Sequence, residues 1–188
     1  MDQSSMMNTA ARYAKATIRL VRRFRHAQGG VTAIEFALLA LPFFAMLSMI
    51  IETSVIFVST SSLDSAVAQA GRLIRTGQLQ SSNMSAAAFT AIICDNLMLV
   101  SDCSSTLKVD VRNFTTFGSA TFPSLIDANG NPITTTAYQP GTAGDIVLVR
   151  AFYPWKMMSP LSLGFDNLSG NQHLVASSVA FRNEPFNN

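Results

Sequence analysis

The chain has 188 residues and a mass of 20.3 kDa, which leaves room for one modest domain beside a membrane anchor and excludes a second full domain. Its residues are 48% hydrophobic and only 13% charged, with a mean hydropathy of +0.28, whereas soluble domains carry about 25% charged residues. The small net charge of +2 conceals a strongly basic N-terminus, so the composition favours a chain that lies partly in lipid.

Residues 1–30 form a basic head whose only acid is Asp2. Its cations are Arg12, Lys15, Arg19, Arg22, Arg23 and Arg25. A basic segment can bind nucleic acid, but this one adjoins a long apolar run, which is the arrangement that orients membrane helices with the basic end in the cytoplasm. We therefore expect a cytoplasmic leader and no nucleic-acid partner.

The next segment, residues 31–58, is expected to be a transmembrane helix, because it exceeds the roughly 20 residues that cross a bilayer. Glu35 and Glu52 would lie about 25 Å apart along it, near opposite edges of the hydrocarbon. The positive-inside rule then places residues 59–188 outside the cytoplasm. A secretory signal cleaved near Ala66–Ala68 is the alternative, but the apolar region of such signals spans only about 7 to 15 residues.

The junction of head and helix carries a recognisable layout. Gly30 ends the basic head, an apolar helix begins at Val31, and an acid follows at Glu35. This layout resembles the class III signal of type IV pilins and pseudopilins, in which a prepilin peptidase cuts after the glycine on the cytoplasmic face. The resemblance implies cleavage after Gly30 and a mature N-terminus at Val31, with Thr32 similar to the hydroxyl residue that pilins often carry at the second mature position.

Such a cut would create an α-amine on Val31, whose ordinary pKa is about 7.7 to 8, one helical turn from Glu35. Among staggered helices, the Glu35 carboxylate could neutralise the amine of a neighbouring subunit and so set the register of assembly. The simpler interpretation is an acid favoured by the positive end of the helix dipole, which stabilises by about 0.3 to 1 kcal/mol. The combination with Gly30, the basic leader and the apolar run favours the processing site.

Beyond the membrane, residues 59–80 keep a helical stripe, so the anchor is expected to continue outward as a helix with a stop at Gly77. The stripe consists of Leu63, Val67, Ala70 and Ile74. Ser85 is placed to cap a second helix. The apolar face of that helix would be formed by Phe89, Ile92, Ile93 and Leu97.

Cys94 and Cys103 follow, nine positions apart. This spacing favours a disulfide that closes a turn over a pair of free thiols, provided that this part of the chain lies in an oxidising compartment. No second cysteine pair or nearby histidine completes a metal site. We therefore expect a structural disulfide and no bound metal or cofactor.

Three strands are predicted from their residue patterns, over 107–113, 145–153 and 174–181. Turn residues and a threonine-rich stretch separate the first two. The expected fold is α+β, with the long N-terminal helix packed on a small antiparallel sheet in a pilin-like arrangement.

The whole pattern resembles the TadE-like family. It combines the start of the apolar helix with Ala70–Arg72, the cysteine pair, the strand end Tyr153–Trp155 and the terminal motif Phe181–Pro185. The resemblance implies a minor pseudopilin of the tight-adherence (Flp) pilus machinery, which is itself similar to type II secretion systems. The implied partners are the membrane, prepilin peptidase, other pilins or pseudopilins and the Tad inner-membrane assembly platform. The chain is longer than major Flp pilins, which favours a subunit that initiates or caps a pilus used in adherence.

Enzyme chemistry is not expected. Outside the leader, His173 is the only histidine, and the acids are scattered singly along the chain. A surface or strand role is the simpler interpretation of His173, and packing is the simpler use of Trp155 and its aromatic neighbours. The alternative function is a single-pass scaffold or binding protein that keeps its leader.

Overall fold

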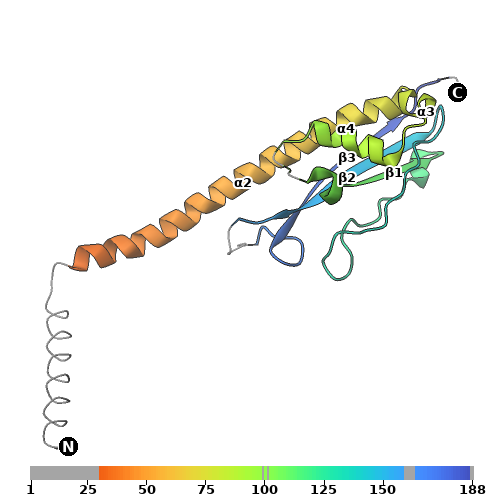
Figure 1. The fold of residues 1–188 in the computed structure, drawn as a ribbon. Helices are drawn as coiled ribbons and strands as arrows, with labels where there is room; N and C mark the ends of the chain where they lie inside the picture. Colours follow the sequence, from red (N-terminus) through yellow and green to blue (C-terminus); the bar gives the residue numbers. More distant parts are fainter. Residues whose placement is uncertain (1–29, 99, 101, 159–163, 187–188) are drawn as a thin grey trace, which may run out of the picture. The chain divides into compact units, whose positions relative to one another are not determined.

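A computed structural model describes residues 30–98, 100, 102–158 and 164–186 (Figure 1). The chain divides into two compact units, Met1–Leu47 and Ser48–Asn188. Residues 1–29, which include most of the expected cytoplasmic leader, lie outside the described residues. The expectation that this basic segment is a cytoplasmic leader therefore remains a prediction.

The first unit contains the beginning of helix α2, which runs from Val31 to Arg75. From Val31 to Ala70 the segment has no glycine, and Pro42 is its single proline. An α-helix satisfies its backbone groups within its own segment, as a chain in lipid requires, and a proline inside it removes one backbone donor.

The second unit contains the rest of α2 and all other elements. The helices are α3 (Gln78–Ser81), α4 (Ala86–Asp95), α5 (Cys103–Thr106) and the short 3₁₀ helix η2 (Phe117–Ser119). The strands are β1 (Lys108–Phe114), β2 (Ile146–Lys156) and β3 (Gln172–Arg182). They form one antiparallel sheet in the order β1-β2-β3, so the α+β fold with three antiparallel strands is confirmed.

Helix α2 ends at Arg75 rather than at residue 80. Gly77 follows with a φ of +76°, a left-handed conformation that glycine adopts at little cost, and its N–H donates to the Ile74 carbonyl at 3.1 Å. The stop predicted at Gly77 is therefore confirmed, and α3 is a separate short helix. Ser85 caps α4 as predicted, because its side chain accepts a hydrogen bond from the Ala88 N–H.

The main core lies between the sheet and the helices α2 and α4. The stripe predicted on α2 is fully buried, and Phe89 and Ile93 of α4 join it. The sheet contributes mainly odd-numbered residues, which point to this face: Val111, Val147, Val149, Ala151, Tyr153 and Val175. Burying each large aliphatic side chain stabilises the fold by about 1.5 to 3 kcal/mol, so this face holds the outer part of α2 to the sheet.

The opposite face of the sheet is covered by the connection between β1 and β2. Phe152 and Leu174 of the sheet pack there with Leu168. Ile126 and Ile133 of the β1–β2 connection pack against this cluster. The same connection also shields the free edge of β1. Val111 exchanges backbone hydrogen bonds with its residues 137 and 139, at 2.8 and 2.9 Å.

Candidate functional site

The apolar part of α2 is the most unusual surface of the protein. Among the described residues, it is the one helix long and apolar enough to cross a membrane. Its large exposed side chains are between 42% and 75% accessible, namely Ile34, Phe36, Leu38, Leu39, Leu41, Phe43, Phe44, Met46, Leu47, Ile50, Ile51, Phe57 and Val58. Apolar surface of this extent requires lipid or partner helices in place of water, as in a single-pass membrane protein.

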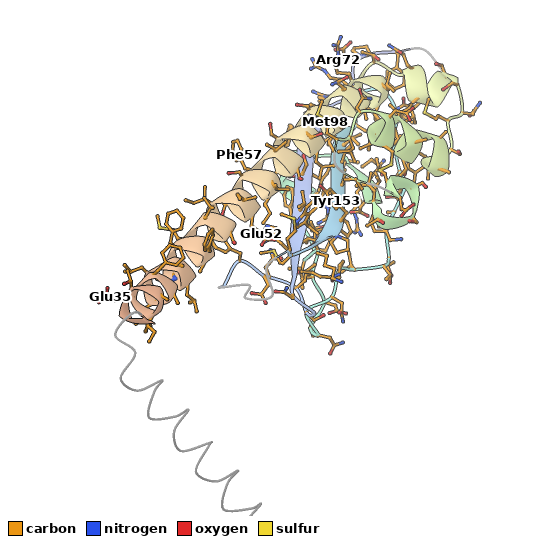
Figure 2. The ribbon with its side chains drawn as sticks, turned by 60° about the vertical axis from the view of Figure 1, so that its left-hand side comes forward. Glu35, Glu52, Phe57, Arg72, Met98 and Tyr153 are labelled. Atoms are coloured by element: carbon orange, nitrogen blue, oxygen red, sulfur yellow. A yellow bond between two sulfur atoms is a disulfide. The ribbon has the colours of Figure 1, made fainter. Side chains whose placement is uncertain are left out.

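The residues predicted for processing and assembly stand at the start of this helix. Gly30 directly precedes α2, and a Cβ built on it would meet nothing within 4 Å. Thr32 and Glu35 follow in the first turns with exposed side chains, and among the described residues Glu35 has no charged partner (Figure 2). An exposed carboxylate on an apolar helix is available to a charge on another molecule, which is the chemistry expected of Glu35.

Glu52 occupies a different environment from the one that the sequence suggests. Its side chain is 3% exposed, and its Oε1 accepts a hydrogen bond of 2.6 Å from the N–H of Met158, just beyond the end of β2. A backbone N–H that donates to a carboxylate oxygen over so short a distance fixes both groups in place. Glu52 therefore joins α2 to the hairpin between β2 and β3, a contact between residues 106 positions apart that periodicity could not reveal.

The other end of the outer helix is held by the C-terminal motif. Gly71 lies under the aromatic ring of Phe181, since a Cβ there would stand 3.0 Å from Cε1 of that ring. Glu184 pairs with Arg75 at 3.2 Å, and its N–H donates to the Arg75 carbonyl at 2.9 Å. The two motifs Ala70–Arg72 and Phe181–Pro185, more than a hundred residues apart, thus meet at one place.

The disulfide joins Cys94 at the end of α4 to Cys103 at the start of α5, with Cα atoms 5.7 Å apart. The predicted pairing is confirmed. It closes the connection that leads from the helices into β1, so it holds α4 close to the sheet.

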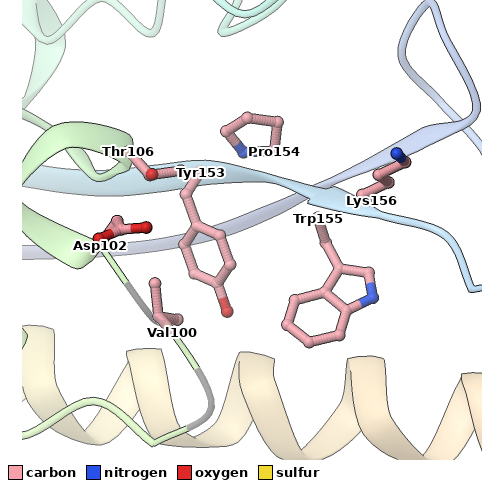
Figure 3. Close-up of a pocket in the computed structure, with 7 residues that line it drawn as sticks. All are labelled: Val100, Asp102, Thr106, Tyr153, Pro154, Trp155 and Lys156. Carbon is pink, nitrogen blue, oxygen red and sulfur yellow. The ribbon is translucent and has the colours of Figure 1, made fainter.

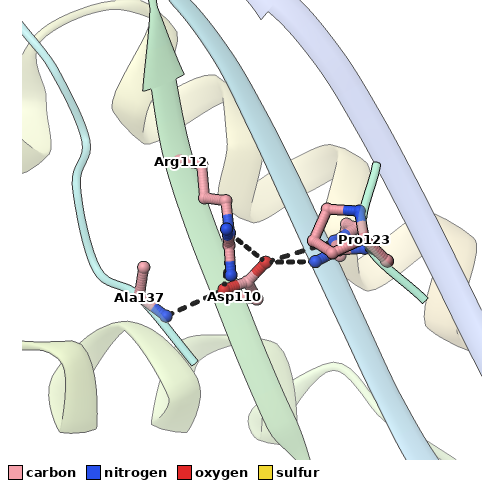
Figure 4. Close-up of polar contacts among 5 residues, drawn as sticks. Asp110, Arg112, Pro123 and Ala137 are labelled. Atoms are coloured by element: carbon pink, nitrogen blue, oxygen red, sulfur yellow. Dashed lines mark hydrogen bonds and ion pairs between the residues drawn. The ribbon is translucent and has the colours of Figure 1, made fainter. Parts of the chain in front are cut away.

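A buried ion pair links the sheet to the connection that covers it (Figure 4). Asp110 of β1 is fully buried and lies 2.6 Å from the guanidinium of Arg150 on β2, which also donates to the Pro123 carbonyl at 2.6 Å. Arg112 contributes a second ion pair at 3.0 Å, and the Ala137 N–H donates to the carboxylate at 2.8 Å. Burial alone would raise the pKa of Asp110, but these hydrogen bonds and charges together lower it.

The sequence analysis treated Asp110 as one of several scattered acids and missed this network. A signal was present, because Asp110 and Arg112 are two positions apart in a strand and must share a face. The network anchors the β1–β2 connection and brings no nucleophile or titrating base to a surface, so its role is structural.

A cavity of about 270 Å³ lies where β2 extends beyond β1 (Figure 3). The pairing of β1 ends at Phe152, and Pro154 follows with no N–H to continue the ladder. Tyr153, Trp155, Lys156 and Asp102 line the space. Burial raises the pKa of the Tyr153 hydroxyl, so this group is a poor base near neutral pH.

His173, the residue on which a hydrolase would depend, lies on β3 with its Nδ1 2.6 Å from the Phe165 carbonyl oxygen. Because a carbonyl can only accept, Nδ1 carries the proton in this contact. Within the described part of the chain, no three metal-ligating side chains form a group. Near the end of β2, the side chains of Phe152, Tyr153 and Met157 are buried and that of Trp155 is partly buried, so packing is their main use.

Comparison with known proteins supports the family resemblance. Residues 30–72 match the family model described as TadE-like protein. The matched segment begins at Gly30, contains the whole exposed apolar part of α2 and ends next to Gly71. No curated protein and no solved structure matches the chain. The match indicates a Tad pilus-related protein whose partners belong to the membrane and the pilus system.

Proposed function

We propose that this Tad pilus-related protein is a minor pseudopilin. It is inserted in the bacterial inner membrane with its basic head in the cytoplasm and residues 59–188 in the periplasm, and a prepilin peptidase cleaves it after Gly30. Helix α2 then joins other pilins or pseudopilins at the base or tip of a pilus that serves adherence. The observation that carries the proposal is the family match, which starts at Gly30 and coincides with the exposed apolar helix.

The assembly step rests on the first turns of α2. Processing leaves a positive amine on Val31, and Glu35 offers an exposed carboxylate about 6 Å further along the helix axis. Within one chain the two groups are offset along the helix, whereas a neighbouring helix shifted by about one turn brings its amine to the carboxylate. In a low-dielectric bundle such a pair is worth several kcal/mol at most, and an unpaired charge there is unfavourable. The charge pair therefore selects how far neighbouring helices are shifted along each other. The apolar side chains of α2 provide the contact surface that holds them together.

The outer domain is suited to a structural role. Its sheet is covered on both faces, and the disulfide and the Asp110 network brace its long connections. We propose that it initiates or caps assembly through contacts with the Tad assembly platform and other pseudopilins, and that it catalyses no reaction.

The experiment that tests processing is expression of the full chain with and without a prepilin peptidase. Loss of residues 1–30 reduces the mass by about 3 kDa, from the mean residue mass of the chain, and leaves an N-terminus at Val31. Gly30→Val should abolish the mass change, whereas Gly29→Ala should not. A chain that stays intact beside an active peptidase would contradict the proposal and favour the retained scaffold.

A second experiment separates assembly from processing. Glu35→Gln keeps the shape of the side chain and removes its charge, so the variant should be cleaved at Val31 yet fail to cross-link to partner pseudopilins in the membrane. Glu35→Asp should retain part of the cross-linking, and Asp64→Asn, which removes an exposed charge from the outer part of α2, should retain all of it. Normal cross-linking of cleaved Glu35→Gln would refute the charge-pairing step.

A further inference from the structure

The hairpin between β2 and β3 carries exposed apolar side chains at the end of the domain that reaches Glu52. Met158 is 61% exposed and Phe165 is 39% exposed, and Lys156 beside them is also exposed. We call these three residues the hairpin surface. Large apolar side chains left open in this way usually mark a contact with a partner or with lipid.

The length of the apolar part of α2 gives the position of this surface relative to the membrane. The residues from Val31 to Ile51 rise about 31 Å along a helix, close to the roughly 30 Å thickness of the hydrocarbon of a bilayer. A hydrocarbon layer that begins at Val31 would therefore end next to Glu52. Beyond Ile51, Glu52 and Ser59 are buried against the outer domain, whereas Phe57 and Val58 remain 73% and 47% exposed.

Because the Met158 N–H bonds directly to Glu52, this end of the hairpin lies beside the part of α2 where the helix would leave the membrane (Figure 2). The Phe165 carbonyl contacts His173, which pairs with Trp155 in the sheet, so Phe165 belongs to the same end of the hairpin. We infer that the hairpin surface contacts the outer leaflet of the membrane that α2 spans, with Met158 and Phe165 against acyl chains and Lys156 among the headgroups.

The residue types fit this occupant. Thioether and aromatic side chains partition into the boundary between headgroups and acyl chains, and a lysine can bury its stem there while its ammonium group reaches phosphate. A second lipid contact beside the helix would restrict the rotation of the outer domain about α2. This inference requires that α2 crosses a bilayer, but it is independent of cleavage and of pilus assembly.

The test uses tryptophan as a probe in the full chain, reconstituted in phosphatidylcholine vesicles with brominated acyl chains, which quench nearby tryptophan. Trp155 is the only tryptophan, so Trp155→Phe supplies a silent background. Single tryptophans are then placed by Met158→Trp and Phe165→Trp in the hairpin surface. Near-ultraviolet circular dichroism and an intact disulfide establish that each variant is folded.

Two matched positions complete the design. Leu41→Trp reports on the apolar part of α2, where the side chain is 75% exposed. Met98→Trp is the control outside the membrane, because Met98 is 69% exposed and its N–H bonds to Ser62, about 15 Å beyond Glu52 along α2.

We expect bromine quenching and a blue-shifted emission at positions 41, 158 and 165, and neither at 98. Quenching at 41 with positions 158 and 165 behaving like 98 would overturn the inference and leave the membrane anchor intact. Equal quenching at 98 and 158 would also overturn it, since lipid contact would then not be confined to the Glu52 level. Absence of quenching at 41 would remove the anchor itself, and with it both the inference and the proposed function.

Discussion

Replacing Asp110 with asparagine tests whether the ion pair beneath the β1–β2 connection stabilises the outer domain. The substitution leaves Arg150, which is 4% exposed, without its buried counter-charge. Breaking one partner of such a pair costs about 3 to 5 kcal/mol, against a total stability of about 5 to 15 kcal/mol for a typical domain. Asp110→Asn should therefore remove a large part of the free energy of unfolding.

The assay is urea unfolding of the full chain in mild detergent, followed by the fluorescence of its single tryptophan, Trp155. Asp64→Asn, on the exposed face of α2, makes the same change of charge without a described partner and should cost less than about 0.5 kcal/mol. Adding Arg150→Met to Asp110→Asn should recover part of the loss, because no charge is then buried alone. A cost for Asp110→Asn as small as that of Asp64→Asn would refute the reasoning.

The pH dependence of the same variant follows from the sign of its shift. The folded-state pKa of Asp110 lies below its ordinary value of 3.8, so its stabilisation is fully present above that value and is lost as the pH falls through the lower, folded-state pKa. Wild type should lose stability in this acidic range. Asp110→Asn should lack the part of this acid-induced loss of stability that comes from Asp110. The part that comes from Asp145, whose pKa is also lowered by its hydrogen bonds, should remain.

Two further variants test the packing of the outer domain by the same unfolding assay. Replacing both Cys94 and Cys103 with serine removes the closure of a loop of about ten residues, so the free energy of unfolding should fall by about 2.5 to 3 kcal/mol; an unchanged midpoint would contradict this estimate. Gly71→Val places branched carbons against Phe181 and Val179 and should lower the free energy of unfolding by at least about 1 to 3 kcal/mol. The control Ala68→Val, on the exposed face of α2, should lower it by about 0.5 kcal/mol. Equal costs would show that the C-terminal motif does not pack on Gly71.

Local patterns in the sequence accounted for the secondary structure of the outer domain. The stripe from Leu63 to Ile74 has the period of a helix and is buried as predicted, and Gly77 and Ser85 mark a helix end and a helix start. Each of these signals depends on neighbours within a few residues, where backbone geometry alone decides which side chains share a face. The three strands were found for the same reason, with ends displaced by up to three residues.

The contacts that position the site are of another kind. Glu52 meets Met158, Asp110 meets Arg150, and Gly71 meets Phe181, in each case across a separation that no periodicity spans. The sequence placed Glu52 at a membrane edge but could not show that the β2–β3 hairpin reaches the same level. Such pairs depend on how the strands align and on which face of α2 packs against the sheet.

By itself, therefore, the sequence determined that a basic head precedes an apolar helix, that Gly30, Val31 and Glu35 stand where a pilin-like signal requires them, and that an α+β domain with a cysteine pair follows. Only the tertiary structure decided which buried charges pair and where the outer domain attaches to its helix. The physical reason is that hydrophobic periodicity specifies a buried face without naming its partner, whereas a hydrogen bond or an ion pair requires two particular groups to meet in space.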